Sequence, residues 1–191
     1  EKLYRPADAF ELSRVTRMEH VNTTIYETPQ EGIACAAARI AKLIRERGAG
    51  GQKAVLSLAS GRSMRDLFAE LVRLHKEEEL SFKNVVIFTT YEYYPLTDLS
   101  TGSVAQIRSL FLDQVDILAE NIHAIPGDLE KENILTFCAD YEKLIAQEGG
   151  IDIQVLGIGQ SGNIAMNEPG TQANSSTRLV ILDNNSRNDA K

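Results

Sequence analysis

Apolar residues recur along this chain in two spacings, one typical of strands and the other typical of helices. Short runs of apolar and β-branched residues predict strands at 21–26, 53–58, 85–88, 122–126, 151–156 and 177–182. Between them, apolar residues three and four positions apart predict helices that begin near Pro29, Ser63, Val104 and Leu129. Because strands alternate with helices of this length, we expect βαβ units and an α/β fold with an open, mainly parallel sheet and helices on both faces.

The helix that begins near Pro29 carries the clearest local signals. Thr28 is its predicted cap, Pro29 occupies the first helical position, and Glu31 can reach back to complete a capping box. By contrast, residues 85–88 include no polar side chain, so this strand is expected to be buried on both faces of the sheet.

The 191 residues suit a single domain at 21–191, preceded by a polar N-terminal extension at 1–20 that forms at most a short helix. The predicted strand at 177–182 lies close to the last residue, and no helix pattern follows it. Since the alternation leads one to expect such a helix, the sheet is predicted to be C-terminally incomplete.

Composition and charge exclude several classes of protein. The formal net charge of −7 argues against wholesale nucleic-acid binding. No apolar run is long enough to span a bilayer, and the first residues show no signal-peptide pattern, so we expect no membrane partner and a cytoplasmic location. Cys35 and Cys138 lie far apart inside predicted helices, where we expect reduced core thiols rather than a disulfide.

Three loops follow predicted strands, at the carboxyl ends where open parallel sheets bind ligands. The first is Ser60-Gly61-Arg62-Ser63, in which a glycine turn, two hydroxyls and a helix N-terminus can form a phosphate cradle. Arg62 can add a forked cationic contact. The alternative is an ordinary turn in which Ser63 caps the following helix; the Gly-Lys-Ser/Thr ending of a P-loop is absent.

The second loop is Tyr91-Glu92-Tyr93-Tyr94-Pro95, whose tyrosines and glutamate can line a sugar site. Tyrosines at a strand end serve more often in packing, so both interpretations stay open. If the chain is extended here, Glu92 points away from the side on which Tyr91 lies, because neighbouring residues then face opposite ways.

The third loop runs from Gly157 to Pro169 and contains three glycines, which allow a sharp turn and a close approach to a ligand. Its Gly157-x-Gly159-x-x-Gly162 spacing formally matches the dinucleotide fingerprint, with Asp183 in the position of the acidic residue. Pro169 forbids the crossover helix that this fingerprint needs, so a dinucleotide is disfavoured. No pair of histidines has metal-ligand spacing, so no metal is expected.

Four segments occur in an order that matches one known family. Residues 55–63 read V-L-S-L-A-S-G-R-S, residues 80–88 read L-S-F-K-N-V-V-I-F, residues 115–122 read V-D-I-L-A-E-N-I, and residues 157–169 read G-I-G-Q-S-G-N-I-A-M-N-E-P. They resemble the phosphate loop V-L-G-L-x-T-G-[GS]-T-P, the segment before F-N-x-D-E-Y, and the motifs V-D-I-P-x-E-N-I and G-x-G-x-D-G-H-I-A-F-N-E-P of the glucosamine-6-phosphate deaminase (isomerase) family. The resemblance implies a Rossmann-like fold, shared with phosphogluconolactonases, ribose-5-phosphate isomerases and coenzyme A transferases.

The resemblance also implies a reaction. The family converts glucosamine 6-phosphate and water to fructose 6-phosphate and ammonia, without a metal or organic cofactor. An aspartate of the D-E-Y motif is the base on C2, and the aspartate and histidine of D-G-H and the glutamate of N-E-P assist ring opening and proton handling. Carried onto this chain, the substrate and phosphate positions are Ser60, Gly61, Arg62, Ser63, Gly159 and Gly162.

The family's catalytic positions are substituted in this sequence. The base position is Tyr91, the aspartate and histidine positions are Ser161 and Asn163, and only the glutamate is retained, as Glu168. A phenol with a pKa of about 10 is no base at neutral pH, and acid–base assistance is worth about 10²- to 10⁴-fold in rate. Glu92 can replace the base only if its loop bends. We therefore expect a pseudoenzyme of amino-sugar metabolism that binds a hexosamine phosphate, with deamination impaired or lost.

Two other functions stay open: a non-catalytic sugar-phosphate sensor or partner subunit of an active paralogue, or an altered activity such as isomerisation or phosphogluconolactonase-like hydrolysis. Chains of this family continue with further strands and helices that supply cations for the substrate phosphate. We therefore expect that this shorter chain either forms a homo-oligomer or is a fragment of a longer protein.

Overall fold

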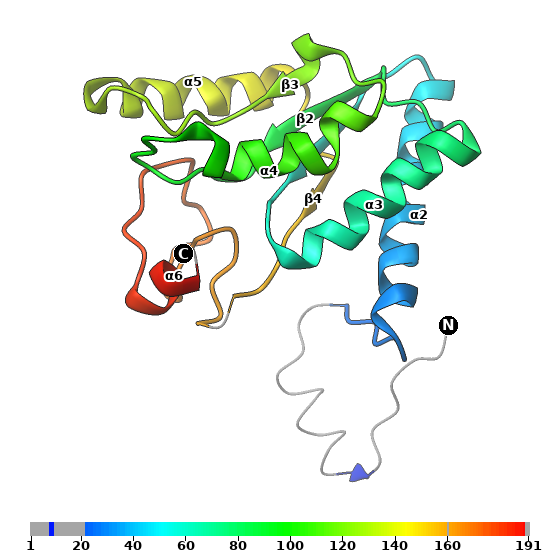
Figure 1. Ribbon diagram of the computed structural model, residues 1–191, viewed down its shortest axis with the longest axis horizontal. Helices are drawn as coiled ribbons and strands as arrows, with labels where there is room; N and C mark the ends of the chain where they lie inside the picture. The colour runs from blue at the N-terminus through cyan, green and yellow to red at the C-terminus, as the bar shows by residue number, and fades with distance from the viewer. Residues whose placement is uncertain (1–7, 10–21, 160, 190–191) are drawn as a thin grey trace.

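The computed structural model describes residues 8–9, 22–159 and 161–189, which Figure 1 colours from the N-terminus to the C-terminus. The expected extension at 1–20 therefore lies outside the described residues, apart from two positions. Residues 22–26 of the predicted strand at 21–26 form no strand, because none of the described segments pairs with them.

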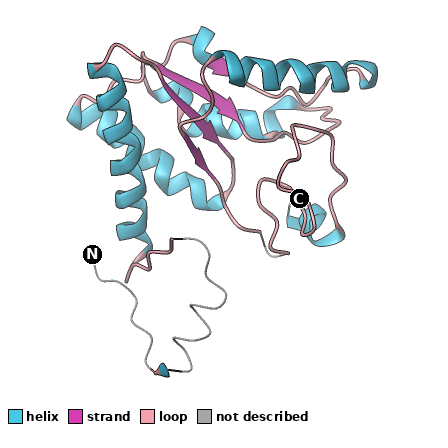
Figure 2. Ribbon diagram, turned by 180° about the vertical axis from the view of Figure 1, so that it is seen from behind, coloured by secondary structure: helices cyan, strands magenta, loops and turns pink. Residues whose placement is uncertain are grey.

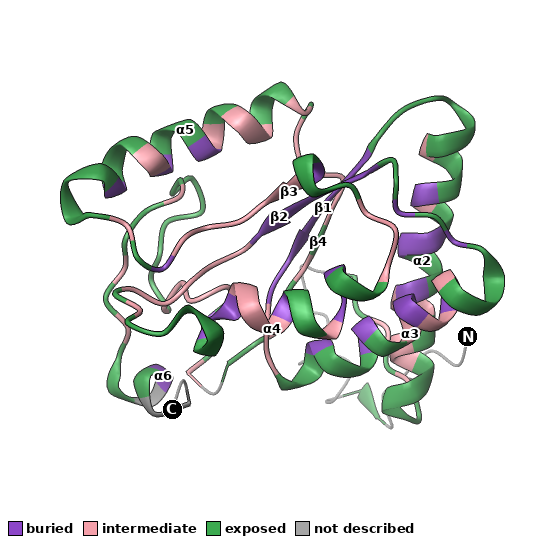
Figure 3. Ribbon diagram, turned by 45° about the horizontal axis from the view of Figure 1, so that its top comes forward, coloured by how far each residue is buried: buried purple, intermediate pink, exposed green. Residues whose placement is uncertain are grey.

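In the described part of the chain, parallel strands form one sheet in the order β3-β2-β1-β4. They are β1 (Ala54–Leu58), β2 (Val85–Thr89), β3 (Ile122–His123) and β4 (Ile153–Val155). Helices α2 (Pro29–Ala49), α3 (Arg62–Glu78) and α4 (Ser103–Leu110) cover one face, and α5 (Ile134–Gln147) covers the other (Figure 2, Figure 3). The predicted parallel sheet with helices on both faces is confirmed.

Shorter helical segments connect these elements. The described residues contain 3₁₀ helices at Leu99–Thr101, Leu112–Gln114, Ala119–Asn121 and Lys131–Asn133, and a last helix, α6, at Asn184–Asp189. Among the helices of the described segments, none is long and apolar enough to cross a membrane. Cys35 and Cys138 are both free thiols; Cys138 is buried, as expected of a core thiol, whereas Cys35 is only half-buried.

Strands β1 and β2 are buried along their whole length, as the apolar run at 85–88 predicts. Successive side chains enter opposite faces of the sheet. Leu56 and Ile87 enter the larger core beneath α2, α3 and α4, whereas Val55 and Phe88 enter a smaller core beneath α5. A slip of either strand by one residue would exchange the two sets, so this burial fixes the register of the pair.

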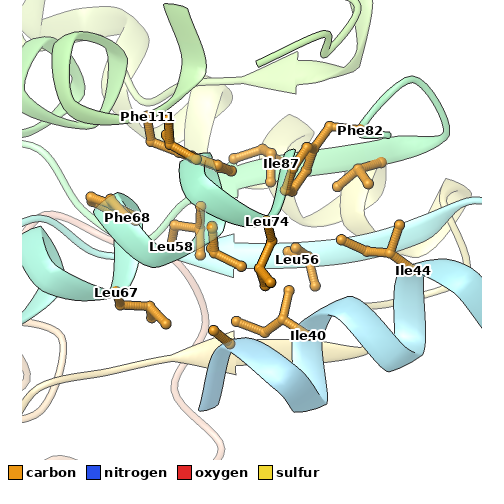
Figure 4. Packing of buried hydrophobic residues seen from close by; sticks show 14 of the residues in the cluster. Ile40, Ile44, Leu56, Leu58, Leu67, Phe68, Leu74, Phe82, Ile87 and Phe111 are labelled. Atoms are coloured by element: carbon orange, nitrogen blue, oxygen red, sulfur yellow. The ribbon is translucent and has the colours of Figure 1, made fainter. Parts of the chain in front are cut away.

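Three phenylalanine rings join separate segments in the larger core (Figure 4). The Phe111 ring, at the end of α4, stacks on Phe68 of α3 with 5.4 Å between ring centroids. It also meets Phe82, just before β2, edge to face at 5.2 Å. Such ring pairs contribute about 0.5–1.5 kcal/mol each beyond the burial of their area, so they hold α3 and α4 against the start of β2.

The predicted start of α2 is confirmed. Pro29 is its first residue, and Thr28 Oγ1 accepts a hydrogen bond from the Glu31 N–H at 3.3 Å. The Glu31 carboxylate reaches back one residue further than the capping box predicts, to the Glu27 N–H at 3.1 Å. The helix ends at Ala49, within the predicted glycine cluster.

Three predictions for the second half of the chain are wrong. Residues 177–182 form no strand, because Thr177 is held at α5 instead, where its N–H and hydroxyl both donate to Glu142. Helix α6 then follows where no helix was predicted. The helix expected from Leu129 begins at Ile134, because the residues just before it form a 3₁₀ turn.

Tyr141→Phe should reduce the loss of stability at alkaline pH. The Tyr141 hydroxyl lies 2.8 Å from the Thr89 carbonyl oxygen and 3.1 Å from that of His123, and burial raises the pKa of this phenol. The unfolded chain therefore releases the proton at a lower pH than the folded chain, so the phenol's contribution is complete below about pH 10 and declines above it, by up to about 1.4 kcal/mol per pH unit.

Denaturant unfolding between about pH 8 and pH 11 measures this decline. Tyr141→Phe should lose about 1 kcal/mol at neutral pH, for the missing hydrogen bond, and then decline less steeply than the wild type. Tyr94→Phe is the control, since this tyrosine lies on a half-exposed loop. Parallel declines for wild type and Tyr141→Phe would contradict the assignment.

Candidate active site

The pairing of β1 with its two neighbours brings three loops to one edge of the sheet. Leu58, the last residue of β1, lies opposite Thr89 of β2 and Val155 of β4. The Thr90 N–H donates to the Leu58 carbonyl at 3.0 Å, so the pairing continues past the end of β2. The segments that leave the sheet here are the three loops that the sequence singled out.

A cavity of 220 Å³ lies among these loops. The predicted site residues that line it are Ser60, Gly61, Arg62, Tyr91, Gly159 and Asn163. Its other lining residues are Ala59, Tyr93, Gly157, Ile158, Ala165, Met166 and Ser186. A larger cavity of 800 Å³ adjoins it on the α5 side and shares Tyr91, Tyr93, Ala165 and Met166 with it.

Gly61 turns the chain from β1 into α3. Its backbone has φ 124° and ψ 171°, a region that is essentially restricted to glycine. Helix α3 begins at Arg62, so Ser63 lies inside the helix and the alternative in which Ser63 caps it is wrong. Within the described chain, no side chain caps this terminus and its first turn holds no acidic residue. No acidic side chain of the first turn therefore compensates the partial positive charge at the N-terminus of α3.

Tyr91 connects the second loop to the first. Its hydroxyl lies 3.0 Å from Ser60 Oγ and donates to the Ser60 carbonyl at 3.1 Å. Burial raises the pKa of the Tyr91 phenol, and the Glu92 carboxylate acts in the same direction. Tyr91 therefore stays neutral at physiological pH and cannot serve as a base.

Glu92 has a structural role in the same loop. Its carboxylate accepts hydrogen bonds from the N–H groups of Ser103 and Val104, at 2.7 and 2.8 Å, and from Tyr93 at 2.8 Å. It thereby compensates the free N–H groups at the start of α4. A Cβ on Gly102 would lie 2.8 Å from this carboxylate, so glycine allows the close contact. Glu92 is not among the residues that line the smaller cavity.

The glycine loop folds back on itself. The Gly159 N–H donates to the Asn163 carbonyl at 2.9 Å, and Ile164 and Asn167 exchange two backbone hydrogen bonds. Between them, Ala165 and Met166 have φ values of 52° and 62°, as a type I′ turn requires. Among the described residues, no helix lies between Gly162 and α6, so the loop lacks the crossover helix of a dinucleotide site.

Glu168, which was predicted to be the retained glutamate, lies in a separate hydrogen-bond network. Its carboxylate accepts from the Ser161 hydroxyl at 3.0 Å, from the Ser186 hydroxyl at 2.7 Å and from the Asp183 N–H at 3.3 Å. Asn163 Nδ2 lies 3.4 Å from Ser186 Oγ, which links the network to the cavity wall. Ser63, Ser161, Gly162 and Glu168 are predicted site residues that do not line the smaller cavity.

Ser186 is a site residue that was not predicted from the sequence. It is buried in α6, which lies beside the glycine loop (Figure 1). Asp183 caps this helix, since its Oδ1 accepts from the Ser186 N–H at 2.7 Å. Aspartate is one of the preferred N-cap residues, so Asp183 could have marked the start of this helix.

The smaller cavity is poor in acid–base groups. Among the described residues that line it there is no carboxylate and no imidazole. The described residues also contain no cluster of three or more histidine, cysteine, aspartate or glutamate side chains that could hold a metal. The cavity offers hydroxyls, the Asn163 amide and the Arg62 guanidinium, which can hold a neutral or anionic polar ligand.

Gly159→Ala should disturb the cavity, whereas Gly157→Ala should not. A Cβ on Gly159 would overlap Asn163 Oδ1, but a Cβ on Gly157 would meet only Ser63 Oγ, at an ordinary 3.4 Å. We expect Gly159→Ala to cost about 1–3 kcal/mol and to shift the Asn163 amide resonance, and Gly157→Ala to stay within about 0.5 kcal/mol of wild type. Equal effects of the two changes on thermal unfolding would show that Asn163 does not pack against Gly159.

Known proteins match most of this chain. The family model described as glucosamine-6-phosphate isomerases/6-phosphogluconolactonase matches residues 27–191. A putative glucosamine-6-phosphate deaminase-like protein of Bacteroides thetaiotaomicron is 48% identical over 190 residues, which cover 99% of this chain and 29% of that protein. The glucosamine-6-phosphate deaminase of Bacillus pumilus is 40% identical over 157 residues, 80% of this chain and 61% of the relative. The chain thus spans less than two thirds of the length of these curated relatives.

Solved structures agree with the sequence matches. A monomeric glucosamine-6-phosphate deaminase has a TM-score of 0.79 at 32% identity, over 85% of this chain and 66% of that one. A 6-phosphogluconolactonase from Plasmodium vivax shares the fold, with a TM-score of 0.62 at 19% identity over 74% of this chain and 47% of that one. The fold, the loops around the cavity and the match over residues 27–191 show that this chain belongs to the glucosamine-6-phosphate isomerase/6-phosphogluconolactonase family, as a glucosamine-6-phosphate deaminase-like member.

Proposed function

We propose that this chain binds a hexosamine phosphate and that its deamination activity is impaired or lost. The observation that supports the proposal is the lining of the smaller cavity, where loops of a deaminase-like fold meet without a carboxylate or imidazole among the described residues. In this proposal the phosphate binds at Ser60, Gly61, Arg62 and Ser63, and Tyr91 and Asn163 shape the pocket for the sugar.

Deamination requires a group that removes the proton from C2. Tyr91 occupies the position of the family's base, and burial raises the pKa of its phenol. Glu92 is committed to three backbone N–H groups. Glu168 can reach a sugar ring only by exchanging its bonds to Ser161 or Ser186. General acid–base assistance is worth about 10²- to 10⁴-fold, so its loss leaves little turnover.

A non-catalytic sensor or partner subunit is the second candidate function, and the same cavity lining supports it. Saturable binding without any turnover would favour this second function over a weakened enzyme. Lactone hydrolysis has less support, because structures of lactonases below 25% identity share the fold alone. We further propose a cytoplasmic location and a homo-oligomeric state, of which sedimentation of the purified chain tests the second.

Ammonia release from glucosamine 6-phosphate tests the proposal directly. We expect a rate at least about 10²-fold below that of the Bacillus pumilus deaminase assayed in parallel, because the acid–base groups are missing. Isothermal titration of the same sugar phosphate should nevertheless show saturable binding, and free glucosamine should bind more weakly. A rate equal to that of the Bacillus enzyme would refute impairment, and absence of binding would refute the site.

Arg62→Ala should weaken binding of glucosamine 6-phosphate by about tenfold, because a charge-assisted contact to the phosphate is lost. Arg65→Ala is the matched control. Arg65 is also exposed on the first turns of α3, but it does not line the cavity. Equal weakening by the two changes would mean that the net charge of the helix end, and not a contact from Arg62, holds the phosphate.

A further inference from the structure

The two contacts between Tyr91 and Ser60 have a fixed direction. Tyr91 Oη lies 3.1 Å from the Ser60 carbonyl oxygen and 3.0 Å from Ser60 Oγ. A carbonyl oxygen only accepts and a phenol has one proton, so Tyr91 donates to the carbonyl. The Ser60 hydroxyl must then donate its own proton to Tyr91 Oη.

This direction commits the single proton of the Ser60 hydroxyl. Toward the cavity that Ser60 lines, its Oγ then presents lone pairs and no donor. A phosphate dianion offers only acceptors, so it receives no hydrogen bond from Ser60 as long as the bond to Tyr91 persists. The donors that remain in this loop are Arg62, the Ser63 hydroxyl and the backbone N–H groups.

The residues on either side of Tyr91 are anchored. The Thr90 N–H pairs with the end of β1 at 3.0 Å. The Glu92 carboxylate holds three backbone N–H groups at 2.7 and 2.8 Å. Because the loop cannot withdraw without breaking these bonds, release of the Ser60 proton requires rotation of the Ser60 side chain itself.

We propose that Tyr91 sets the phosphate affinity of this loop by accepting the hydrogen bond of the Ser60 hydroxyl, so that Ser60 Oγ offers only acceptor lone pairs to the cavity. The inference rests on the proposed function, in which the loop at 60–63 receives the phosphate. Tyr91 acts through Ser60 and is therefore a positioning residue in this role. At the position that resembles the family's ionised base, this chain has the neutral Tyr91, which removes the Ser60 hydroxyl from the donors that the loop at 60–63 can offer to a phosphate.

A double-mutant cycle tests the proposal. Binding of inorganic phosphate and of glucosamine 6-phosphate is measured by ¹⁵N NMR titration for wild type, Tyr91→Phe, Ser60→Ala and the double variant. Tyr91→Phe keeps the ring and frees the Ser60 proton, so it should tighten phosphate binding by about fivefold, since a charge-assisted hydrogen bond replaces a neutral one. The same change in the Ser60→Ala background should give no tightening. Tyr94→Phe, a neighbouring phenol that does not line the smaller cavity, is the matched control.

A second measurement needs no ligand. A hydrogen bond from Ser60 lowers the pKa of the Tyr91 phenol, against the larger upward effect of burial. Ser60→Ala should therefore raise this pKa further, which ¹³Cζ-tyrosine NMR detects for Tyr91 alone. An unchanged titration of Tyr91 would show that Ser60 does not donate to it and would overturn the proposal.

The outcomes separate this inference from the function on which it rests. If wild type binds phosphate but Tyr91→Phe binds it equally or more weakly, the role of Tyr91 is refuted and the proposed function stands. If none of the four proteins binds phosphate, both are refuted. Tightening by Tyr91→Phe that depends on Ser60 supports both.

Discussion

Burial of β1 and β2 on both faces is the constraint on which the rest of the structure depends. Every residue of these two strands is buried, so a register slip would move apolar side chains between two different cores. The fixed register places the ends of β1, β2 and β4 at one level. Three loops that are far apart in sequence therefore meet around one cavity, and the phenylalanine cluster behind them keeps α3 and α4 in place.

Much of this arrangement could be predicted from the sequence, because its signals are local or periodic. The cap at Thr28, the buried run at 85–88 and the three strand-end loops needed no knowledge of tertiary partners. Residues 177–182 show the limit of such patterns. Their β-branched and apolar residues suit a strand, but a strand also needs a neighbouring edge, and Glu142 of α5 holds this segment elsewhere.

The candidate site also has a part that could be predicted from the sequence and a part that could not. Its glycines and hydroxyls could be found by their position after strands, yet the hydrogen bond of Glu168 with Ser186 depends on helix α6, which begins at Asn184, and on its cap at Asp183. The sequence also gave no sign that Glu92 would serve as a helix cap. Glu92 and Glu168 are both engaged in holding backbone N–H and hydroxyl groups, so they stabilise the loops around the cavity, and the described residues that line the cavity include no carboxylate or imidazole.

Gly61 has a further consequence for how this site can change over time. The turn into α3 depends on a backbone conformation and not on any side chain. Peptide N–H groups at a helix start attract an anion whichever side chains surround them. Side chains at positions 60, 62 and 63 can therefore vary without dismantling the turn, and the backbone N–H groups stay in place when they do. Anion binding by backbone N–H groups is separable from acid–base catalysis, because catalysis depends on side chains and the anion contact does not.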